Sequence, residues 1–443
     1  MTKDVEFIIR QLNNAGYEAY IVGGCVRDKI MDKEPHDYDI CTSALPNEVI
    51  NVFKNHRIIE TGLKHGTVTL VLHNNGYEIT TYRCDGKYLD GRHPESVLFV
   101  SNLNEDLMRR DFTMNAIAFD GCEFKDPFNG FNDIKNKCIR CVGNPDDRFK
   151  EDALRILRAM RFSSQLSFEI DKDTEKAMFA NKELICKISA ERIASEFSKI
   201  LLGDNVFSVL MKYRDIIATF IPEIKDTFDF EQKNDWHIYD VYEHICHSVK
   251  NIEPNLILRM TMFFHDIEKP ACFFVDDSNV GHFYGHPAKS AKTTKQILKR
   301  LKYPNEIIEN VDILVYNHDR RIVTTKTAIR KLLNKFSFEN AKNLILVKKA
   351  DASAQNPAKN SESGYLEELD VINTLIEEVS SNGDCVRIKD LAVNGNDLKE
   401  LGFTPSPRFK DILDFALLLV IEGKVDNNKE LLTKEILKKF EVM

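Results

Sequence analysis

The chain has 443 residues, a net charge of −8 at pH 7 and 43% hydrophobic residues. This length exceeds what one core usually needs, so we expect several domains. With 29% charged residues and no apolar run near the ~20 residues of a spanning helix, the composition argues against a membrane protein. Ten cysteines without an export signal favour reduced thiols and a cytoplasmic location. The net charge does not indicate a nucleic-acid-binding protein, although a local basic surface would be enough to bind phosphate groups.

The first part of the chain, residues 1–141, mixes helical and strand-like patterns. An amphipathic helix begins near the N-terminus, and short strands are predicted at 19–24 and 36–43. The patterns at 66–83 and 115–128 each predict a hairpin, because two alternating runs flank a turn. These elements together predict a sheet with flanking helices.

From Arg148 onward apolar residues recur with the period of a helix. The pattern predicts amphipathic helices over 148–166 and 189–203, and a polar linker at 354–363. We therefore predict an α+β protein. Its predicted parts are an α/β head at 1–141 followed by all-α segments at 142–204, 205–354 and 355–443.

Two carboxylates stand one residue apart in the predicted second strand. Asp37 and Asp39 alternate there, so both side chains are expected on one face, ~7 Å apart. Such a pair can hold divalent cations, and hard oxygen ligands suit Mg²⁺. Gly23 and Gly24 would let the backbone approach a triphosphate, to which Arg27 supplies positive charge. Alone, the carboxylate pair is more often a solvated strand or turn, and the glycines with Arg27 favour the functional interpretation.

The motifs of the first 200 residues resemble one family when they are taken in order. The matching stretches are GGCVRD, DYDICTSALP, KHGTVTLV, YEITTYR, DGRHPESVLFV, LMRRDFTMNAIA, DPFNG, RFKEDALRILRAMRF and ISAERIASEFSKIL. They resemble the class II tRNA nucleotidyltransferases of the DNA polymerase β-like superfamily, which comprise CCA-adding enzymes and bacterial poly(A) polymerase relatives. The tail from Val393 resembles the tRNA-contacting segment of that family, with Ser406 where glycine is usual.

The resemblance implies a reaction and its site. The 3′-hydroxyl of tRNA would attack the α-phosphate of CTP or ATP with release of pyrophosphate, and no DNA or membrane partner is expected. Asp37 and Asp39 would be the catalytic carboxylates that bind Mg²⁺. Glu78, in the neighbouring hairpin, is the candidate third carboxylate that orients or deprotonates the hydroxyl, although an exposed strand glutamate is an equal interpretation.

The stretch EDALRILRAMR carries a candidate nucleotide template. On one continuous helix Asp152, Arg155 and Arg158 would share a face, and a solvated ion pair is the simpler interpretation. A carboxylate beside a guanidinium, however, complements the amine and ring nitrogen of cytosine and adenine, and mismatches uracil and guanine. The resemblance implies this template role for Asp152 and Arg155. It places Arg158, Arg161 and Arg109 against phosphate or ribose.

A second group of motifs lies downstream: VYEHICHSV, FFHDIEKP, GHPAKSA, YNHD and KADASA. They resemble the HD-domain phosphohydrolases, in which imidazoles and carboxylates bind a divalent metal that activates water. The central motif usually has glycine where this chain has Glu268. The implied ligands of an unidentified metal are His244, His265, Asp266 and Asp351, with His286 and His318 for a second metal.

Several alternatives stay open at this stage. The segment YRCDGKYLDGRHPESV resembles a family loop associated with addition of A, but it does not separate CCA addition from A-only addition or poly(A) synthesis. The HD-like site could instead be the main activity, as a phosphatase or cyclic phosphodiesterase. A non-enzymatic RNA-binding factor is a further alternative, against which the intact carboxylate pair argues.

Overall fold

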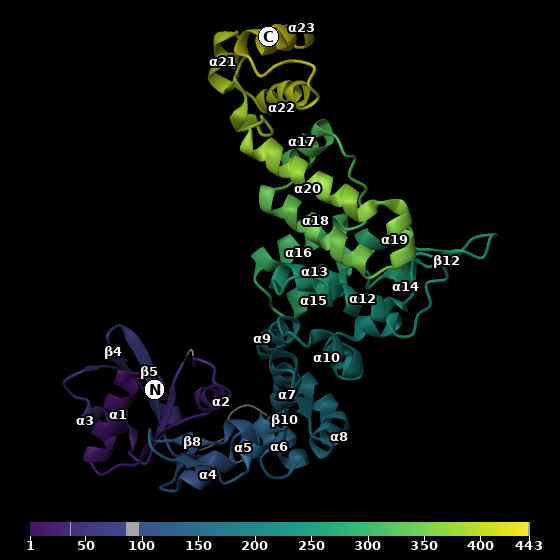
Figure 1. The fold of residues 1–443 in the computed structure, drawn as a ribbon. Helices are drawn as coiled ribbons and strands as arrows, with labels where there is room; N and C mark the ends of the chain where they lie inside the picture. The colour runs from purple at the N-terminus through teal and green to yellow at the C-terminus, as the bar shows by residue number, and fades with distance from the viewer. Residues whose placement is uncertain (36, 86–96, 442–443) are drawn as a thin grey trace. The chain divides into compact units, whose positions relative to one another are not determined.

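The computed structural model describes residues 1–35, 37–85 and 97–441. The chain divides into two compact units, Met1–Pro222 and Glu223–Met443 (Figure 1). Among the described residues, no helix combines the length and the apolar character that crossing a membrane requires. The predicted α+β class is confirmed: the sheet lies in the first unit, and helices follow it. The predicted boundaries at 141, 204 and 354 remain predictions.

The first unit contains a seven-stranded sheet in the order β3-β4-β5-β2-β1-β8-β9. Only β2 and β5 run parallel, and every other neighbouring pair is antiparallel. The sheet strands are β1 (Ala19–Val22), β2 (Asp39–Thr42), β3 (Arg57–Ile59), β4 (Thr67–Leu72), β5 (Asn75–Thr81), β8 (Ala118–Phe119) and β9 (Phe124–Lys125). Two smaller pairs are β6 (Arg83–Asp85) with β7 (Val97–Phe99), and β10 (Cys138–Ile139) with β11 (Glu169–Ile170).

Both predicted hairpins are confirmed. The β4–β5 hairpin turns through His73 and Asn74, whose φ angles of 48° and 67° suit the tight two-residue turn that matches strand twist. In β4 the buried and half-buried residues alternate, as a strand with one core face requires. The helices α1 (Lys3–Asn14) and α3 (Pro46–Val52) pack against the sheet (Figure 1).

The remaining helices of the first unit are α2 (Gly24–Ile30), α4 (Leu103–Met108), α5 (Gly130–Lys135), α6 (Pro145–Glu151), α7 (Leu154–Leu166), α8 (Lys172–Asn181), α9 (Ala190–Leu201), α10 (Val206–Lys212) and α11 (Arg214–Phe220). Among them, α2 packs against β1, and those from α6 onward pack chiefly on one another. The predicted helix at 189–203 is thus confirmed as α9.

The prediction of one continuous helix over 148–166 is wrong. The chain leaves the helix at Asp152, where φ is −142° and ψ is 102°, so α6 and α7 are separate. The Asp152 side chain accepts a hydrogen bond from the Leu154 backbone N–H at 3.0 Å, which caps the start of α7. Asp152 therefore does not share a helix face with Arg155, contrary to the expectation from spacing.

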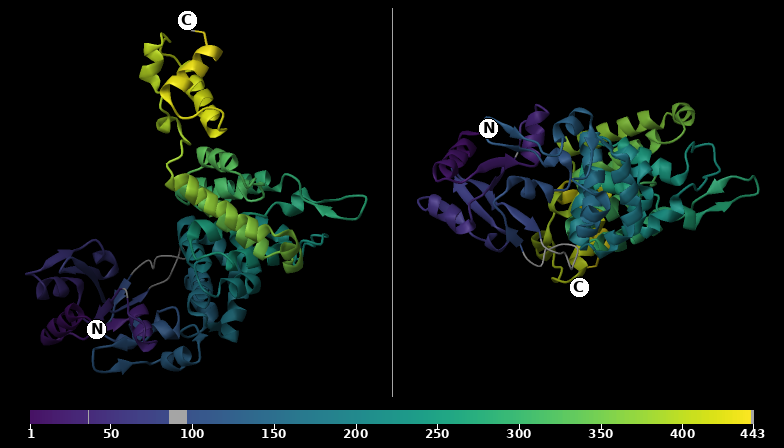
Figure 2. Two further views of the ribbon diagram at one scale, coloured as in Figure 1. Left: turned by 45° about the horizontal axis from the view of Figure 1, so that its top comes forward. Right: turned by 90° about the horizontal axis from the view of Figure 1, so that it is seen from below.

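The second unit is helical apart from one hairpin of β12 (Phe274–Val275) and β13 (Gly281–His282), which extends away from the helices in both views of Figure 2. Its helices are α12 (Val241–Lys250), α13 (Leu256–Phe264), α14 (Lys269–Cys272), α15 (His286–Arg300), α16 (Asn305–Asn317), α17 (Lys326–Lys335), α18 (Phe338–Ser353), α19 (Pro357–Ser363), α20 (Tyr365–Ser381), α21 (Gly395–Glu400), α22 (Arg408–Ile421) and α23 (Lys429–Lys439).

The linker predicted at 354–363 is wrong, because most of it is helix α19. The Asn356 side chain caps this helix by accepting from the Ala358 N–H at 3.1 Å, and Pro357 occupies its first turn. Helix α19 packs against α20 inside the second unit. The polar composition that indicated a linker thus reflects a helix start.

Candidate active site and metal centre

A glycine turn after β1 forms one border of the candidate active site. Gly23 has a φ of +78°, which a residue with a side chain rarely adopts. A Cβ there would lie 3.3 Å from Arg110 Nη1 and 3.5 Å from Asp39 Oδ2. The glycine thus keeps open a space between a carboxylate and a guanidinium. Gly24 follows as the first residue of α2.

Two of the three candidate carboxylates of the first unit lie opposite each other on the β2–β5 pair. Glu78 is the register partner of Asp39, and both side chains are exposed. Desolvation by the surrounding protein raises the pKa of Asp39, and the charge of Asp37 raises it further, while Arg110 opposes both. Strand β2 begins only at Asp39, so the expected strand alternation does not extend to Asp37. His36, next to it, lies outside the described residues.

The two template residues are bonded to other groups and not to each other. Asp152 Oδ2 accepts from Arg192 Nη2 at 2.8 Å, while its other oxygen caps α7. Arg155 donates to Glu151 at 2.8 Å and to the backbone oxygen of Arg109 at 2.8 Å. These bonds hold an acceptor and a donor in fixed orientations close together in the chain. Arg192, on α9, has no place in the expectation from the sequence.

The other arginines expected near nucleotide are also engaged by the protein. Arg158 Nε donates to Asp111 Oδ2 at 2.7 Å, and Arg161 Nη1 donates to Glu196 at 3.2 Å. Burial raises the pKa of Asp111, but the Arg158 guanidinium outweighs it and holds that pKa at about 2. Desolvation and the neighbouring Arg158 lower the pKa of Arg161 to about 10.

Arg27 is similarly buried and engaged. It donates to Asp28 Oδ1 at 2.7 Å and to Asn115 Oδ1 at 3.0 Å. Asn115 in turn donates to Asp111 at 3.2 Å, which links Arg27 to the Arg158 pair. Contacts of these arginines with phosphate or ribose therefore stay a prediction.

Arg110 is a site residue that the sequence reasoning missed. It lies beside Asp39 and Gly23, and its Nη2 donates to the fully buried Asp106 at 3.2 Å. Arg109, which was expected to contact nucleotide, bonds to the same Asp106 at 2.8 Å. The motif MRRDF contained this residue, but its second arginine, Arg110, and not Arg109, is the one that lies near Asp39.

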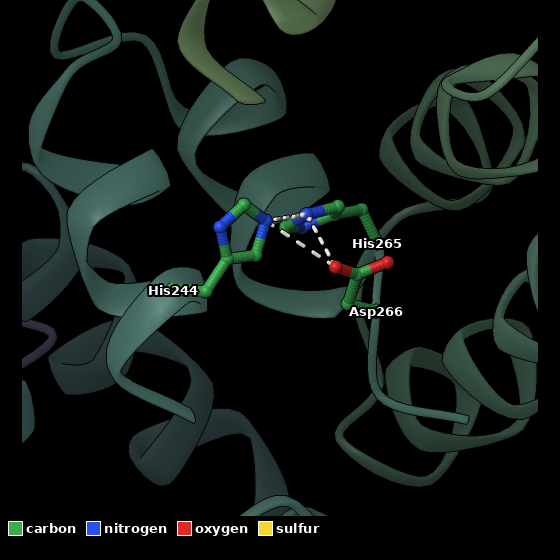
Figure 3. A group of neighbouring side chains, drawn as sticks. All are labelled: His244, His265 and Asp266. Carbon is green, nitrogen blue, oxygen red and sulfur yellow. Dashed lines mark hydrogen bonds and ion pairs between the residues drawn. The ribbon is translucent and has the colours of Figure 1, made fainter. Parts of the chain in front are cut away.

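The second unit gathers the predicted histidines and aspartates from five helices and their ends. His265 and Asp266 follow α13, His244 lies on α12 and Asp351 on α18. Asp266 Oδ2 lies 3.1 Å from His265 Nε2 and 3.3 Å from His244 Nε2 (Figure 3). Asp351 Oδ1 lies 3.0 Å from the same nitrogen of His244.

The other oxygen of Asp266 faces the remaining two histidines. His286 Nε2 lies 3.2 Å from Asp266 Oδ1, and His318 Nε2 lies 3.6 Å from it. Among the described residues, the groups with three ligand atoms within 4.8 Å of one another are His244–His265–Asp266 and Asp266–His286–His318. The head carboxylates Asp37, Asp39 and Glu78 do not form such a group. We call the five residues of the two groups in the second unit, together with Asp351, the His–Asp cluster.

The ring orientation of each histidine leaves one nitrogen for a metal. The Nδ1 atoms of all four are within hydrogen-bond distance of backbone carbonyls, which only accept, so each Nδ1 carries the proton. The carbonyl partners of His244, His265, His286 and His318 belong to Ala354, Met262, Phe283 and Val315. The unprotonated Nε2 atoms therefore converge on Asp266. Asp266 is buried and each of its oxygens lies near two of these nitrogens, so the donor set fits divalent cations.

Lys269 is a further buried residue of the cluster. Its Nζ lies 2.7 Å from Asp266 Oδ2, 2.9 Å from Gln232 Oε1 and 3.2 Å from His237 Nε2. Although burial opposes it, the neighbouring His265 and then the Lys269 ammonium hold the pKa of Asp266 well below its ordinary value. Glu268, the residue that departs from the usual motif, instead accepts from Thr293 Oγ1 at 2.6 Å.

Three family models match separate parts of the chain. They are described as "Poly A polymerase head domain" over 19–140, "Probable RNA and SrmB- binding site of polymerase A" over 167–228, and "tRNA nucleotidyltransferase domain 2" over 286–436. The first covers the sheet and the glycine turn. The third covers His286, His318 and Asp351.

Relatives and solved structures agree with these matches. A CCA-adding enzyme of Limosilactobacillus reuteri is 34% identical over 440 residues, covering 97% of this chain and 94% of the relative. One from Lactobacillus helveticus is 52% identical over 199 residues, which is 45% of this chain and 49% of the relative. The Bacillus stearothermophilus CCA-adding enzyme crystallised with CTP is 28% identical, with a TM-score of 0.77 and coverage of 99% and 98%. This similarity spans nearly the whole length of the chain, which therefore belongs to the family of CCA-adding enzymes.

Proposed function

We propose that Asp37, Asp39 and Glu78 form the transfer centre of this CCA-adding enzyme. The chain is a nucleotidyltransferase that adds C, C and A to the 3′ end of tRNA from CTP and ATP, without a nucleic-acid template. The observation that carries the site assignment is the register of β2 and β5, which sets Glu78 opposite Asp39. Gly23 leaves room beside this pair, and Arg110 supplies positive charge.

The carboxylates suit a magnesium ion. Asp39 is desolvated next to a second negative charge, an arrangement that a bound cation stabilises. Mg²⁺ held by Asp37 and Asp39 would neutralise charge on the α-phosphate and the departing pyrophosphate. In the transfer the tRNA 3′-oxygen bonds to the α-phosphorus, the bond to pyrophosphate breaks, and Glu78 accepts the hydroxyl proton.

Nucleotide choice is assigned to Asp152 and Arg155. A carboxylate accepts from the exocyclic amine of cytosine or adenine, and a guanidinium donates to the adjacent ring nitrogen. Arg192 and Glu151 keep these two side chains oriented before nucleotide arrives. Uracil and guanine present a carbonyl and a ring N–H instead, which leaves both protein groups unpaired.

The test is incubation with tRNA lacking its 3′ CCA, Mg²⁺ and each labelled nucleotide, separately and mixed, resolved at single-nucleotide resolution. We expect C, C and A in order, and no product with the Asp39→Asn variant. A matched control is Glu123→Gln, an exposed acid on the same unit, which should act as wild type. Long A tails would identify a poly(A) polymerase. Addition of A alone, and only to tRNA that already ends in CC, would identify an A-adding enzyme. Activity of Asp39→Asn would refute the site.

A second candidate function, metal-dependent phosphoester hydrolysis, is favoured by the His–Asp cluster. The carrying observation is Asp266, whose two oxygens each face two imidazole Nε2 atoms. His244, His265, Asp266 and Asp351 would hold one divalent metal, and His286 and His318 with Asp266 a second. Such a metal lowers the pKa of bound water to make a nucleophile for phosphate. Lys269 also pairs with the shared carboxylate, at the Oδ2 atom that faces His244 and His265.

The metal content of the purified chain tests this function. After incubation with Mn²⁺ and gel filtration, we expect wild type to retain metal and to hydrolyse bis(p-nitrophenyl) phosphate, with loss of both in His265→Ala. The control is His282→Ala, a histidine outside the cluster whose Nε2 lies 2.7 Å from Asp276. CCA addition should persist in both variants. A wild type that retains no metal, or a His265→Ala variant that hydrolyses normally, would overturn the assignment.

A further inference from the structure

A cavity of about 850 Å³ opens in the second unit beside the His–Asp cluster. Its walls come from the loop at 233–236, the tip of the β12–β13 hairpin and helix α19. The walls are joined by backbone bonds: the Gly281 N–H donates to the Lys233 carbonyl at 2.8 Å, and the Asn356 N–H to the Trp236 carbonyl at 2.8 Å. The cavity is therefore a built feature of three separate segments.

Trp236 is the most distinctive lining residue. It is the only tryptophan in the chain, and 44% of it is exposed at the cavity. An exposed indole offers a flat face of the kind on which nucleobases stack. The backbone at Trp236 is fixed, because its carbonyl accepts from the Asn356 N–H, and the next residue, the half-buried His237, contacts Lys269.

The other lining groups match the remaining parts of a ribonucleotide. Lys233 and Lys359 offer cations for a phosphate, with Lys359 Nζ also 3.3 Å from Glu362, and Asn279 offers an amide for the edge of a base. Two carboxylates, Asp235 and Glu362, also line the cavity, so its charge is balanced and does not suit a polyanion alone. Carboxylates accept hydrogen bonds from the two hydroxyls of ribose. A deoxynucleotide has fewer such hydroxyls, and a phosphate has none.

We propose that this cavity binds one ribonucleotide, with its base on Trp236, its ribose hydroxyls toward the carboxylates and its phosphate toward the lysines. The ligand is either a free nucleotide or one unpaired residue of an RNA. This site is separate from the nucleotide site proposed in the first unit. It adjoins the His–Asp cluster through His237, whose ring lies 5.3 Å from that of His244, but its occupancy requires no metal.

The single tryptophan makes the test direct, because its fluorescence reports from the cavity itself. With the full chain in EDTA, titration with adenosine 5′-monophosphate should quench this fluorescence saturably. Ribose 5-phosphate, which lacks a base, should not quench, and 2′-deoxyadenosine monophosphate should bind several-fold more weakly. If a short oligoadenylate binds more tightly than the mononucleotide, the natural ligand is RNA. If the two bind with equal affinity, the natural ligand is a free nucleotide.

Variants separate cavity binding from a distant effect. Lys359→Gln should weaken quenching about fivefold or more, since a charge-assisted bond is lost, whereas Tyr284→Ala, an exposed aromatic outside the cavity lining, should not. By equilibrium dialysis, Trp236→Phe should keep binding within about threefold and Trp236→Ala should lose about tenfold or more. Absence of saturable quenching, or equal binding by Trp236→Ala and wild type, would overturn the proposal whether or not the cluster hydrolyses phosphoesters.

Discussion

Asp152→Asn is expected to change which nucleotides the enzyme accepts while leaving the fold intact. The asparagine keeps one side-chain oxygen, so the cap on the Leu154 N–H survives. Its amide nitrogen replaces the oxygen that accepts from Arg192, which removes an ion pair between partly exposed groups. Loss of that pair costs under ~1 kcal/mol of stability. The main consequence is a donor where the base needs an acceptor.

The expected magnitude follows from this single bond. A hydrogen bond to an ionised carboxylate contributes ~1.5–3 kcal/mol. Its loss corresponds to a fall of ~10- to 150-fold in kcat/KM for CTP and ATP. Uridine triphosphate presents a carbonyl at the same place, which the new amide can donate to, so its kcat/KM should rise relative to that of CTP.

The assay is single-nucleotide addition to tRNA ending in CC and to tRNA lacking CCA, with each of the four nucleotides. Glu151→Gln is the matched control, because it is the adjacent acid and bonds to Arg155 at 2.8 Å. That change should lower kcat/KM for all four nucleotides together without altering the order of preference among them. An unchanged preference for C and A in Asp152→Asn, or the same altered preference in Glu151→Gln, would refute the template assignment.

Three other predictions concern the first unit. The pH–rate profile of CCA addition should have an acid limb above pH ~4, since the pKa of Asp39 is raised, and Arg110→Met should move that limb higher. Asp111, with a pKa near 2 when folded and ~3.9 when unfolded, contributes ~2.6 kcal/mol of stability above pH ~4, and this is lost as pH falls toward 2. Urea unfolding of Arg158→Met should lack this pH dependence. Gly23→Ala should cost ~1–2 kcal/mol, measured as a lower Tm, and slow transfer about tenfold.

Periodicity predicted the elements of the head well because each is short and local. The β4–β5 hairpin follows from two alternating runs and a turn, all within the stretch that forms it. The register of β2 with β5 is different, since it joins segments far apart and depends on how the whole sheet closes. Glu78 was named through resemblance, and only the register gives a physical reason to prefer it over an exposed strand glutamate.

The errors have local physical causes. A continuous helical period over 148–166 hides the break at Asp152, because an aspartate side chain competes for the backbone N–H groups that a helix would use. At 354–363 the polar letters indicated a linker, yet asparagine followed by proline is also how a helix begins. In each case one side-chain-to-backbone bond outweighed the average character of the segment.

Residues without a pattern of their own were beyond prediction. Gln232 and His237 lie in an irregular loop, and nothing in their spacing indicates that they meet Lys269. Arg192 lies on a helix whose period was recognised, but its partner Asp152 is set by how α9 packs against α7. Such contacts arise from tertiary packing, which the order of residues along one element does not contain.

The arginines of the first unit share a feature that bears on catalysis. Arg27, Arg155, Arg158 and Arg161 each bond to a carboxylate of the protein. A guanidinium has five N–H donors in one plane, so a carboxylate that takes one or two of them fixes the plane and leaves the others directed. If these arginines contact nucleotide as we propose, their orientation would be set before substrate binds, which would spare the transfer step that entropy. Lysine offers no such plane, and substitution by lysine would keep the charge while losing this function.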